Sequence, residues 1–268
     1  MRIRILLASV LVLGLAGVLW LDRACGDGWI LLGLAALACL WGMSELFGLL
    51  AGIGAPVRVL TAAGALALLG AARSSAAAAG LVFVALAVVL LLVALTRPAP
   101  ADGVREIGAA LFALVYLGVF PAVLILLRRR ADGWEIVVGL LACVKAGDIG
   151  AYFTGRFLGR YRLAPRLSPR KTVEGLAGGL TLAAATGALL LGPAFGVAAL
   201  GGARGGLVFG LAAGAAGALG DLVESMLKRA AQTKDSGGVL PGFGGILDLI
   251  DSPLLAAPVV SLGVLWLC

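Results

Sequence analysis

The feature that most constrains this chain is a succession of long apolar stretches separated only by short charged segments. A helix needs about 20 apolar residues to cross a bilayer, and by that measure the sequence holds about nine spans. They cover residues 3–21, 28–54, 56–72, 75–96, 107–127, 134–158, 173–200, 205–229 and 247–267. The sequence therefore predicts an all-α integral membrane protein, a polytopic bundle of about nine transmembrane helices.

The composition excludes a soluble fold. Hydrophobic residues make up 62% of the 268 residues and the mean hydropathy is +1.11, whereas about half of a soluble domain is apolar. The 41 glycines suit helices that pack closely in lipid. We expect a single membrane domain, in which residues 1–130 supply the N-terminal helices and residues 131–268 supply the C-terminal helices that carry the candidate functional site.

The net charge of +7 indicates loops that face the cytoplasm and anionic headgroups, so we expect membrane lipids and no nucleic acid as partners. With the N-terminus inside, the inner segments hold 14 of the 21 Lys and Arg residues and the outer segments hold 6. Because cytoplasmic loops carry more Lys and Arg, this asymmetry predicts a cytoplasmic N-terminus. The run Arg128–Arg130 is the exception, and its role is left open.

Charged side chains inside an apolar span are candidate functional residues, because each is costly unless it is paired or hydrated. In the sixth span, Lys145, Asp148 and Tyr152 follow the spacing i, i+3 and i+7, which places them on one face of a helix. The alternative is a buried Lys145–Asp148 pair that serves only helix packing. The chain has no histidine, which leaves carboxylates, lysines and arginines for chemistry.

The eighth span ends in a second polar face, formed by Asp221, Glu224, Ser225 and Lys228. Two carboxylates on one helix face in a membrane repel each other unless a cation lies between them. Oxygen ligands without histidine suit Mg²⁺, although Lys228 could supply the cation instead. A helix end whose long side chains reach the interface explains Lys228 and Arg229, but not the deeper Asp221.

The last span begins with Asp248 and Asp251, preceded by the glycine-rich segment 241–245. Acidic residues in a first helical turn commonly do no more than complement the helix dipole. Glycines at this point, however, would let backbone N–H groups approach a phosphate closely. A further basic segment, 168–172, precedes the seventh span, and it is either a phosphate contact or charge that sets the topology.

Together these segments resemble the phosphatidate cytidylyltransferase (CDP-diglyceride synthase) family. The family pattern S-x-x-K-R, K-D and P-G-H-G-G-x-x-D-R-x-D-S recurs at 225–229, 234–235 and 241–252. Upstream, D-x-x-A-Y-x-x-G-R and S-P-K-K-T-x-E-G recur at 148–156 and 168–175. The N-terminal half matches only as hydrophobic spans.

The chain departs from the family pattern at two positions. Phe243 stands where the family has histidine, and Leu249 stands where it has arginine. Each departure removes a hydrogen-bond donor from the last motif, and the residues expected to hold metal and phosphate are intact. Whether the two changes reduce or redirect the activity is left open.

The resemblance implies an enzyme that transfers CMP from CTP to phosphatidate, giving CDP-diacylglycerol and pyrophosphate in phospholipid biosynthesis. It also implies Mg²⁺ as cofactor, with K⁺ as a candidate second ion, and a homodimer as the candidate assembly. The implied metal ligands are Asp221, Asp248 and Glu224. The implied catalytic residues are Asp221, Lys228, Arg229, Asp248 and Asp251. The implied substrate-binding residues are Asp148, Tyr152, Ser168, Arg170, Lys171, Thr172, Ser225, Lys234, Asp235, Gly244 and Gly245.

This function places the protein in the inner (plasma) membrane as a multi-pass protein, with its active site facing the cytoplasm. One alternative is a related CTP-dependent transferase or kinase that acts on an isoprenoid or another lipid alcohol. A second alternative is a lipid or ion transporter, or a scaffold without catalytic activity, that uses the same intramembrane charges.

Overall fold

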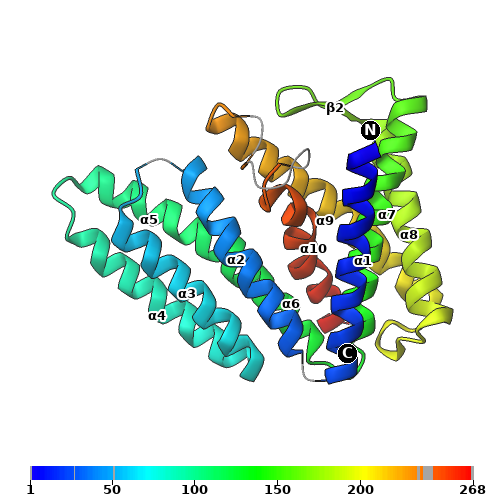
Figure 1. The fold of residues 1–268 in the computed structure, drawn as a ribbon, viewed down its shortest axis with the longest axis horizontal. Helices are drawn as coiled ribbons and strands as arrows, with labels where there is room; N and C mark the ends of the chain where they lie inside the picture. The colour runs from blue at the N-terminus through cyan, green and yellow to red at the C-terminus, as the bar shows by residue number, and fades with distance from the viewer. Residues whose placement is uncertain (1, 27, 51, 234–235, 238–243, 267–268) are drawn as a thin grey trace. The chain divides into compact units, whose positions relative to one another are not determined.

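The computed structural model describes residues 2–26, 28–50, 52–233, 236–237 and 244–266. Helices dominate this part of the chain (Figure 1). They are α1 (Arg2–Cys25), α2 (Trp29–Leu49), α3 (Ala55–Ser74), α4 (Ala76–Leu95), α5 (Pro100–Leu114), α6 (Phe120–Arg128), α7 (Gly133–Leu158), α8 (Val173–Leu189), α9 (Ala203–Ala230) and α10 (Leu247–Trp266). Two π-helical turns, Val115–Val119 and Leu190–Ala194, and a 3₁₀ turn, Ala198–Leu200, complete the helical structure of the described residues.

Eight helical segments of the described chain are long and apolar enough to cross a membrane. They are α2, α3, α4, the continuous α5–α6 segment, α7, α8 with the π-helical turn that follows it, α9 and α10. The predicted fold class, an all-α polytopic membrane protein, is therefore confirmed. α1 coincides with the first predicted span, and its passage through the membrane stays a prediction, as does the side on which the N-terminus lies.

The boundary between the second and third predicted spans differs from the structure by several residues. α2 ends at Leu49 and α3 begins at Ala55, whereas the sequence analysis extended the second span to residue 54. The turn between the two helices contains Gly52 at φ +87°, a conformation that side chains with a Cβ rarely adopt. α3 then begins with Pro56 in its first turn, where the missing N–H group costs nothing.

The chain folds into two compact units. The first unit comprises residues 1–129 and 235–249, and the second comprises residues 130–234 and 250–268. α10 contributes its first three residues to the first unit and the rest to the second.

In the first unit, α3 packs between α4 and the α5–α6 segment (Figure 1). Its core contains fully buried side chains from α2, α3, α5 and α6, including Met43, Leu68, Leu114 and Ile125. α4 is the most apolar of the eight candidate spans, and 11% of its most apolar stretch is buried. An apolar helix that stays largely uncovered suits contact with lipid, where hydrophobic side chains need no protein partner.

In the second unit, α8 packs between α7 and α9 through glycines. A Cβ at Gly150 would lie 2.8 Å from the carbonyl oxygen of Gly178, across the α7–α8 contact. Between α8 and α9, Cβ atoms at Gly187 and Gly206 would each collide with the other residue's backbone. The glycines at these contacts therefore allow close helix packing, as expected in lipid.

A short hairpin joins α7 to α8 in the second unit, where the sequence analysis expected a basic loop. Strands β1 (Arg162–Ala164) and β2 (Ser168–Thr172) pair antiparallel, with Arg162 opposite Thr172. Figure 1 shows β2 beyond the ends of α7 and α8 that it connects. The strands escaped prediction because they are short and charged, and because Pro169 interrupts the second, which is tolerated in an edge strand.

The hairpin is fastened at both ends to the start of α8. Thr172 is the N-cap of α8, and its Oγ1 accepts a hydrogen bond of 3.1 Å from the N–H of Gly175. Glu174 accepts hydrogen bonds from the N–H groups of Arg160, at 3.1 Å, and Tyr161, at 3.3 Å. These bonds satisfy backbone donors at a helix start and where the chain enters the hairpin, so the hairpin is tied to the membrane helix.

Candidate functional site

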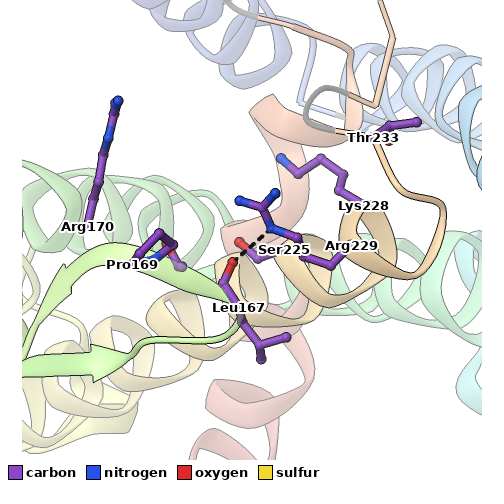
Figure 2. Close-up of a pocket in the computed structure, with 8 residues that line it drawn as sticks. Leu167, Pro169, Arg170, Ser225, Lys228, Arg229 and Thr233 are labelled. Atoms are coloured by element: carbon purple, nitrogen blue, oxygen red, sulfur yellow. Dashed lines mark hydrogen bonds between the residues drawn. The ribbon is translucent and has the colours of Figure 1, made fainter.

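The hairpin and the C-terminal end of α9 enclose a pocket of about 290 Å³ in the second unit (Figure 2). It is lined by Leu167, Ser168, Pro169, Arg170, Ser225, Lys228, Arg229 and Thr233. Five of these residues were predicted from the sequence as catalytic or substrate-binding residues. The structure therefore brings together two motifs, 168–172 and 225–229, that are more than 50 residues apart in the chain.

The pocket is basic because Arg170 of β2 and Lys228 and Arg229 of α9 are among the residues that line it. Figure 2 shows Lys228 and Arg229 extending from α9, Ser225 behind them, and Arg170 projecting from β2. The Nε of Arg229 donates a hydrogen bond of 3.4 Å to the carbonyl oxygen of Leu167. The Nζ of Lys228 lies 3.0 Å from the Oε2 of Glu224, one turn deeper in the same helix. A concave surface with this charge suits an anion with several oxygens, such as a phosphate.

A cluster of carboxyl groups lies deeper along α9 in the same unit. The Oδ2 of Asp221 lies 2.8 Å from the Nζ of Lys171, in strand β2 of the hairpin. The hydroxyl of Ser252, on α10, donates to the Oδ1 of Asp221 at 2.8 Å. The N–H of Ser252 donates to the Oδ1 of Asp251 at 2.6 Å. A Cβ on Gly220 would collide with the carbonyl group of Asp251, so the absence of a side chain lets α9 and α10 meet here.

The carboxyl group of Asp251 interacts electrostatically with those of Asp221 and Glu224. Glu224 and Asp251 are each 3% exposed. Three adjacent carboxyl groups cannot all be ionised in so buried a place unless cations neutralise them. Lys171 and Lys228 supply two such cations in the structure.

Within the described chain, no group of three or more His, Cys, Asp or Glu side chains is arranged to hold a metal ion. The donors gathered around Asp221 and Asp251 are nevertheless all oxygens. Mg²⁺ is commonly held by one or two carboxylates and keeps several water ligands. Carboxylate and hydroxyl oxygens are the kind of ligand that Mg²⁺ prefers, and a metal site at this cluster stays a prediction.

Asp248 belongs to the first unit and has a different environment. Its Oδ2 accepts hydrogen bonds from the hydroxyl of Ser236, at 2.7 Å, and from the N–H of Gly245, at 2.8 Å. Gly244 has φ +90°, which favours glycine. Gly244 and Gly245, which the sequence predicted as phosphate contacts, thus lie against the Asp248 carboxylate. The metal site expected to include both Asp221 and Asp248 stays a prediction.

The sequence analysis missed Glu45, near the end of α2. Its carboxylate accepts hydrogen bonds from the N–H groups of Ile246, at 2.9 Å, and Leu247, at 3.0 Å. Glu45 is the one charged residue of the predicted span 28–54. The rule that drew attention to Lys145 and Asp148, a charge inside an apolar span, would also have found it.

The polar face predicted for the sixth span is present on α7. The Nζ of Lys145 lies 3.1 Å from the Oδ2 of Asp148, and the two side chains are 46% and 37% exposed. The hydroxyl of Tyr152 accepts a hydrogen bond of 2.9 Å from Arg156. The described residues therefore cover this ion pair only in part, and its role stays a prediction.

Asp148 also interacts electrostatically with Asp221 and Lys171, so α7 adds a charge to the surroundings of the cluster. The hydroxyl of Thr172 is used by the cap of α8, which accounts for that residue structurally. Three residues singled out from the sequence, Lys234, Asp235 and Phe243, lie outside the described residues.

Comparison with known proteins agrees with the sequence motifs. Residues 2–266 match the profile of the Cytidylyltransferase family. The phosphatidate cytidylyltransferase of Bacillus subtilis is 40% identical over 155 residues, which cover 57% of this chain and 56% of the relative. The phosphatidate cytidylyltransferase of Synechocystis sp. is 45% identical over 130 residues, covering 48% and 42% of the two chains. The uncharacterized protein YnbB of Escherichia coli is 40% identical over 136 residues, covering 51% and 44%.

The chain spans about half the length of the curated relatives that it matches. The family profile, in contrast, extends over almost all of the chain, including the N-terminal half in which the motifs are absent. The resemblance found in the sequence is thereby confirmed, and the chain belongs to the cytidylyltransferase family.

Proposed function

We propose that this protein is a phosphatidate cytidylyltransferase, which converts CTP and phosphatidate into CDP-diacylglycerol and pyrophosphate. The observation that carries the proposal is the basic pocket between the hairpin and α9, one helical turn above a carboxyl cluster. The relatives from Bacillus subtilis and Synechocystis carry the name of this enzyme.

In the proposed reaction, a phosphate oxygen of phosphatidate forms a bond to the α-phosphorus of CTP. The bond from this phosphorus to the oxygen bridging it to the β-phosphorus breaks, and pyrophosphate leaves with that electron pair. Both substrates are anions, so the protein has to hold them close together and neutralise their repulsion. Arg170, Lys228 and Arg229 have the charge and the place in the pocket for this work. No general base is needed if phosphatidate enters ionised.

We further propose that Asp221 holds Mg²⁺ together with Asp251 or Glu224, with Asp248 as the remaining predicted ligand. When bound there, Mg²⁺ would act as a Lewis acid and neutralise phosphate charge. Lys171 neutralises Asp221 in the structure. Its ammonium group is therefore near enough to the carboxyl cluster to bind a phosphate that approaches the metal ligands. A K⁺ requirement and a homodimer stay predictions.

The proposed location is the inner (plasma) membrane, with the pocket facing the cytoplasm. Within the first unit, contacts between helix ends support the predicted alternation of the spans. Arg73 lies over the ring of Trp29, 5.1 Å from its centroid, and both residues are predicted to be on the outer side. Glu106 accepts a hydrogen bond from Arg97 at 2.8 Å, and both are predicted near the inner side. The charge asymmetry then supports the cytoplasm as the inner side.

The proposal can be tested with the purified full-length protein in detergent, supplied with labelled CTP, phosphatidate and Mg²⁺. We expect labelled lipid and an equal amount of pyrophosphate. Arg229→Gln, which removes a pocket cation, should lower the rate about a hundredfold. Arg204→Gln changes an exposed arginine at the opposite end of α9 and should leave the rate within about twofold of wild type.

The same experiment separates the alternatives. A CTP-dependent kinase would release CDP and phosphorylate a lipid alcohol, with no pyrophosphate. A transporter would move lipid or ions in proteoliposomes without consuming nucleotide. Either result, with no labelled lipid from phosphatidate, would overturn the proposed function.

A further inference from the structure

We propose that Glu45 is a positioning residue that fixes the start of α10 and, through it, the orientation of Asp248. The inference deepens the proposed function, and its catalytic consequence rests on that function. Glu45 belongs to α2, far from the motifs in sequence, and its contacts with residues 236–247 all lie within the first unit.

Burial of the Glu45 carboxylate is unfavourable for the folded protein unless other groups compensate it. Glu45 is 8% exposed and lies in a helix that is otherwise apolar. Here the compensation comes from two backbone donors, the N–H of Ile246 on Oε1 and the N–H of Leu247 on Oε2. Glu45 and the start of α10 therefore depend on each other.

The donors to Glu45 are backbone N–H groups at the start of α10. The first N–H groups of a helix have no partner within the helix and carry partial positive charge. Leu247 is the first residue of α10, and Ile246 directly precedes it. Glu45, a residue of α2, thus caps the start of α10. In most helices the capping side chain comes instead from the residue at the helix's own start.

The backbone donors of this turn are divided between the carboxylates of Glu45 and Asp248. While Glu45 accepts from Ile246 and Leu247, the Oδ2 of Asp248 accepts from the N–H of Gly245 at 2.8 Å. The Ser236 hydroxyl lies 2.7 Å from the Oδ2 of Asp248 and 3.3 Å from the Oε2 of Glu45, so it bridges the two carboxylates. The turn before α10 is therefore held from both sides, and the Asp248 carboxylate has one defined orientation.

The glycine at position 245 follows from this arrangement. A Cβ there would collide with the Oε2 of Glu45 and with the hydroxyl of Ser236. A Cβ on Gly237 would lie 2.7 Å from the Oε1 of Glu45. The backbone thus approaches the Glu45 carboxylate closely, and a side chain at either glycine would have to displace it. A carboxylate that only filled space in α2 would not demand this approach.

The first test measures hydrogen exchange in the purified full-length protein, without nucleotide. In Glu45→Gln, the side-chain NH₂ group replaces one acceptor oxygen, so one of the two backbone N–H groups loses its partner. We expect whichever of the Ile246 and Leu247 amides loses its acceptor to exchange about tenfold faster than in wild type. Glu106→Gln is the control, because Glu106 is a second buried glutamate of the first unit, with partners at Gly54 and Arg97. It should leave these two amides unchanged.

The second test asks whether Glu45 acts through Asp248. In Glu45→Gln, kcat should fall about tenfold or more while the KM for CTP changes less than about threefold, because misplacing a catalytic group mainly slows the chemical step. The double variant Glu45→Gln/Asp248→Asn should be no slower than Asp248→Asn, since residues that act as a unit are not additive. A purely structural glutamate would instead add its effect to that of Asp248→Asn.

Unchanged exchange at Ile246 and Leu247 in Glu45→Gln would overturn the proposal, as would the same increase in Glu106→Gln. If Glu45→Gln does not accumulate, Glu45→Asp keeps the charge with a shorter reach and should show the same selective exchange. If the wild-type protein transfers no cytidylyl group, the proposed function fails. The exchange measurement then still decides whether Glu45 holds α10.

Discussion

Asp22 and Arg128, which are 106 residues apart in the sequence, form a buried ion pair with 2.6 Å between the Oδ2 and Nε atoms. The side chains are 1% and 12% exposed. The Oδ1 of Asp22 also accepts a hydrogen bond of 3.0 Å from the N–H of Leu31. The pair joins α1, α2 and α6, and it neutralises one of the three arginines, Arg128–Arg130, that oppose the charge asymmetry.

We predict that Arg128→Met destabilises the protein by about 3–5 kcal/mol, because it leaves the Asp22 carboxylate buried without its cation. Thermal unfolding of the purified protein in detergent would measure the loss. Arg129→Met is the matched control, because Arg129 is exposed, and its effect should stay within about 0.5 kcal/mol. Equal destabilisation by the two variants would show that the ion pair is not the cause.

A second prediction concerns the proposed metal ligands. Asp221→Asn and Asp248→Asn should each lower cytidylyl transfer by about 10²-fold or more, while the protein still inserts and purifies. The double variant should be little worse than either single variant if the two carboxylates act together. Asp102→Asn changes an exposed carboxylate that is paired with Arg105, and it should be nearly silent. Activity close to wild type in either single variant would end the assignment.

A third prediction concerns topology. In a background without the four native cysteines, single cysteines at Arg160 and Gln232 should both react with a membrane-impermeant thiol reagent from the cytoplasmic side. Arg160 precedes the segment 167–170 and Gln232 lies within the segment 225–233, and residues of both segments line one pocket. A cysteine at Arg204, at the opposite end of α9, should react from the other side. Labelling of Arg160 and Gln232 from opposite sides would rule out a shared pocket.

A fourth prediction concerns the departure from the family pattern at Phe243. Backbone N–H groups and cations usually dominate phosphate stabilisation, so the missing imidazole should matter little. Phe243→His should then change kcat/KM by about tenfold or less, which corresponds to about 1.4 kcal/mol. A natural protein without activity, in which Phe243→His with Leu249→Arg restores cytidylyl transfer, would identify a repurposed relative.

The spans could be predicted because lipid leaves the backbone few choices. Each long apolar stretch became a helix, and errors are confined to ends such as Leu49, where Gly52 and Pro56 set the turn. The residues of the basic pocket could also be predicted, because helical spacing puts Ser225 and Lys228 near one another on a helix. Ser168 lines the same pocket because the segment before α8 folds into a hairpin. A short charged segment does not predict a hairpin.

Partners between helices could not be predicted from the sequence. Periodicity tells which residues share a face, but not which helix lies opposite that face. The pairing of Glu45 with Ile246 and that of Asp22 with Arg128 therefore appear only in the structure. Both involve a single charge within or beside an apolar stretch, and such a charge indicates a buried partner without naming it.

Thr172 has two places in the fold, because it is the last residue of β2 and the N-cap of α8. No linker separates the strand from the helix, so a rotation of the strand about its axis has to turn the first turn of α8 as well. The basic wall of the pocket thus takes its position from the membrane-spanning part of the chain. A substrate headgroup would meet a surface whose depth is already fixed. Lengthening the hairpin by one residue would shift that surface without removing any charged residue.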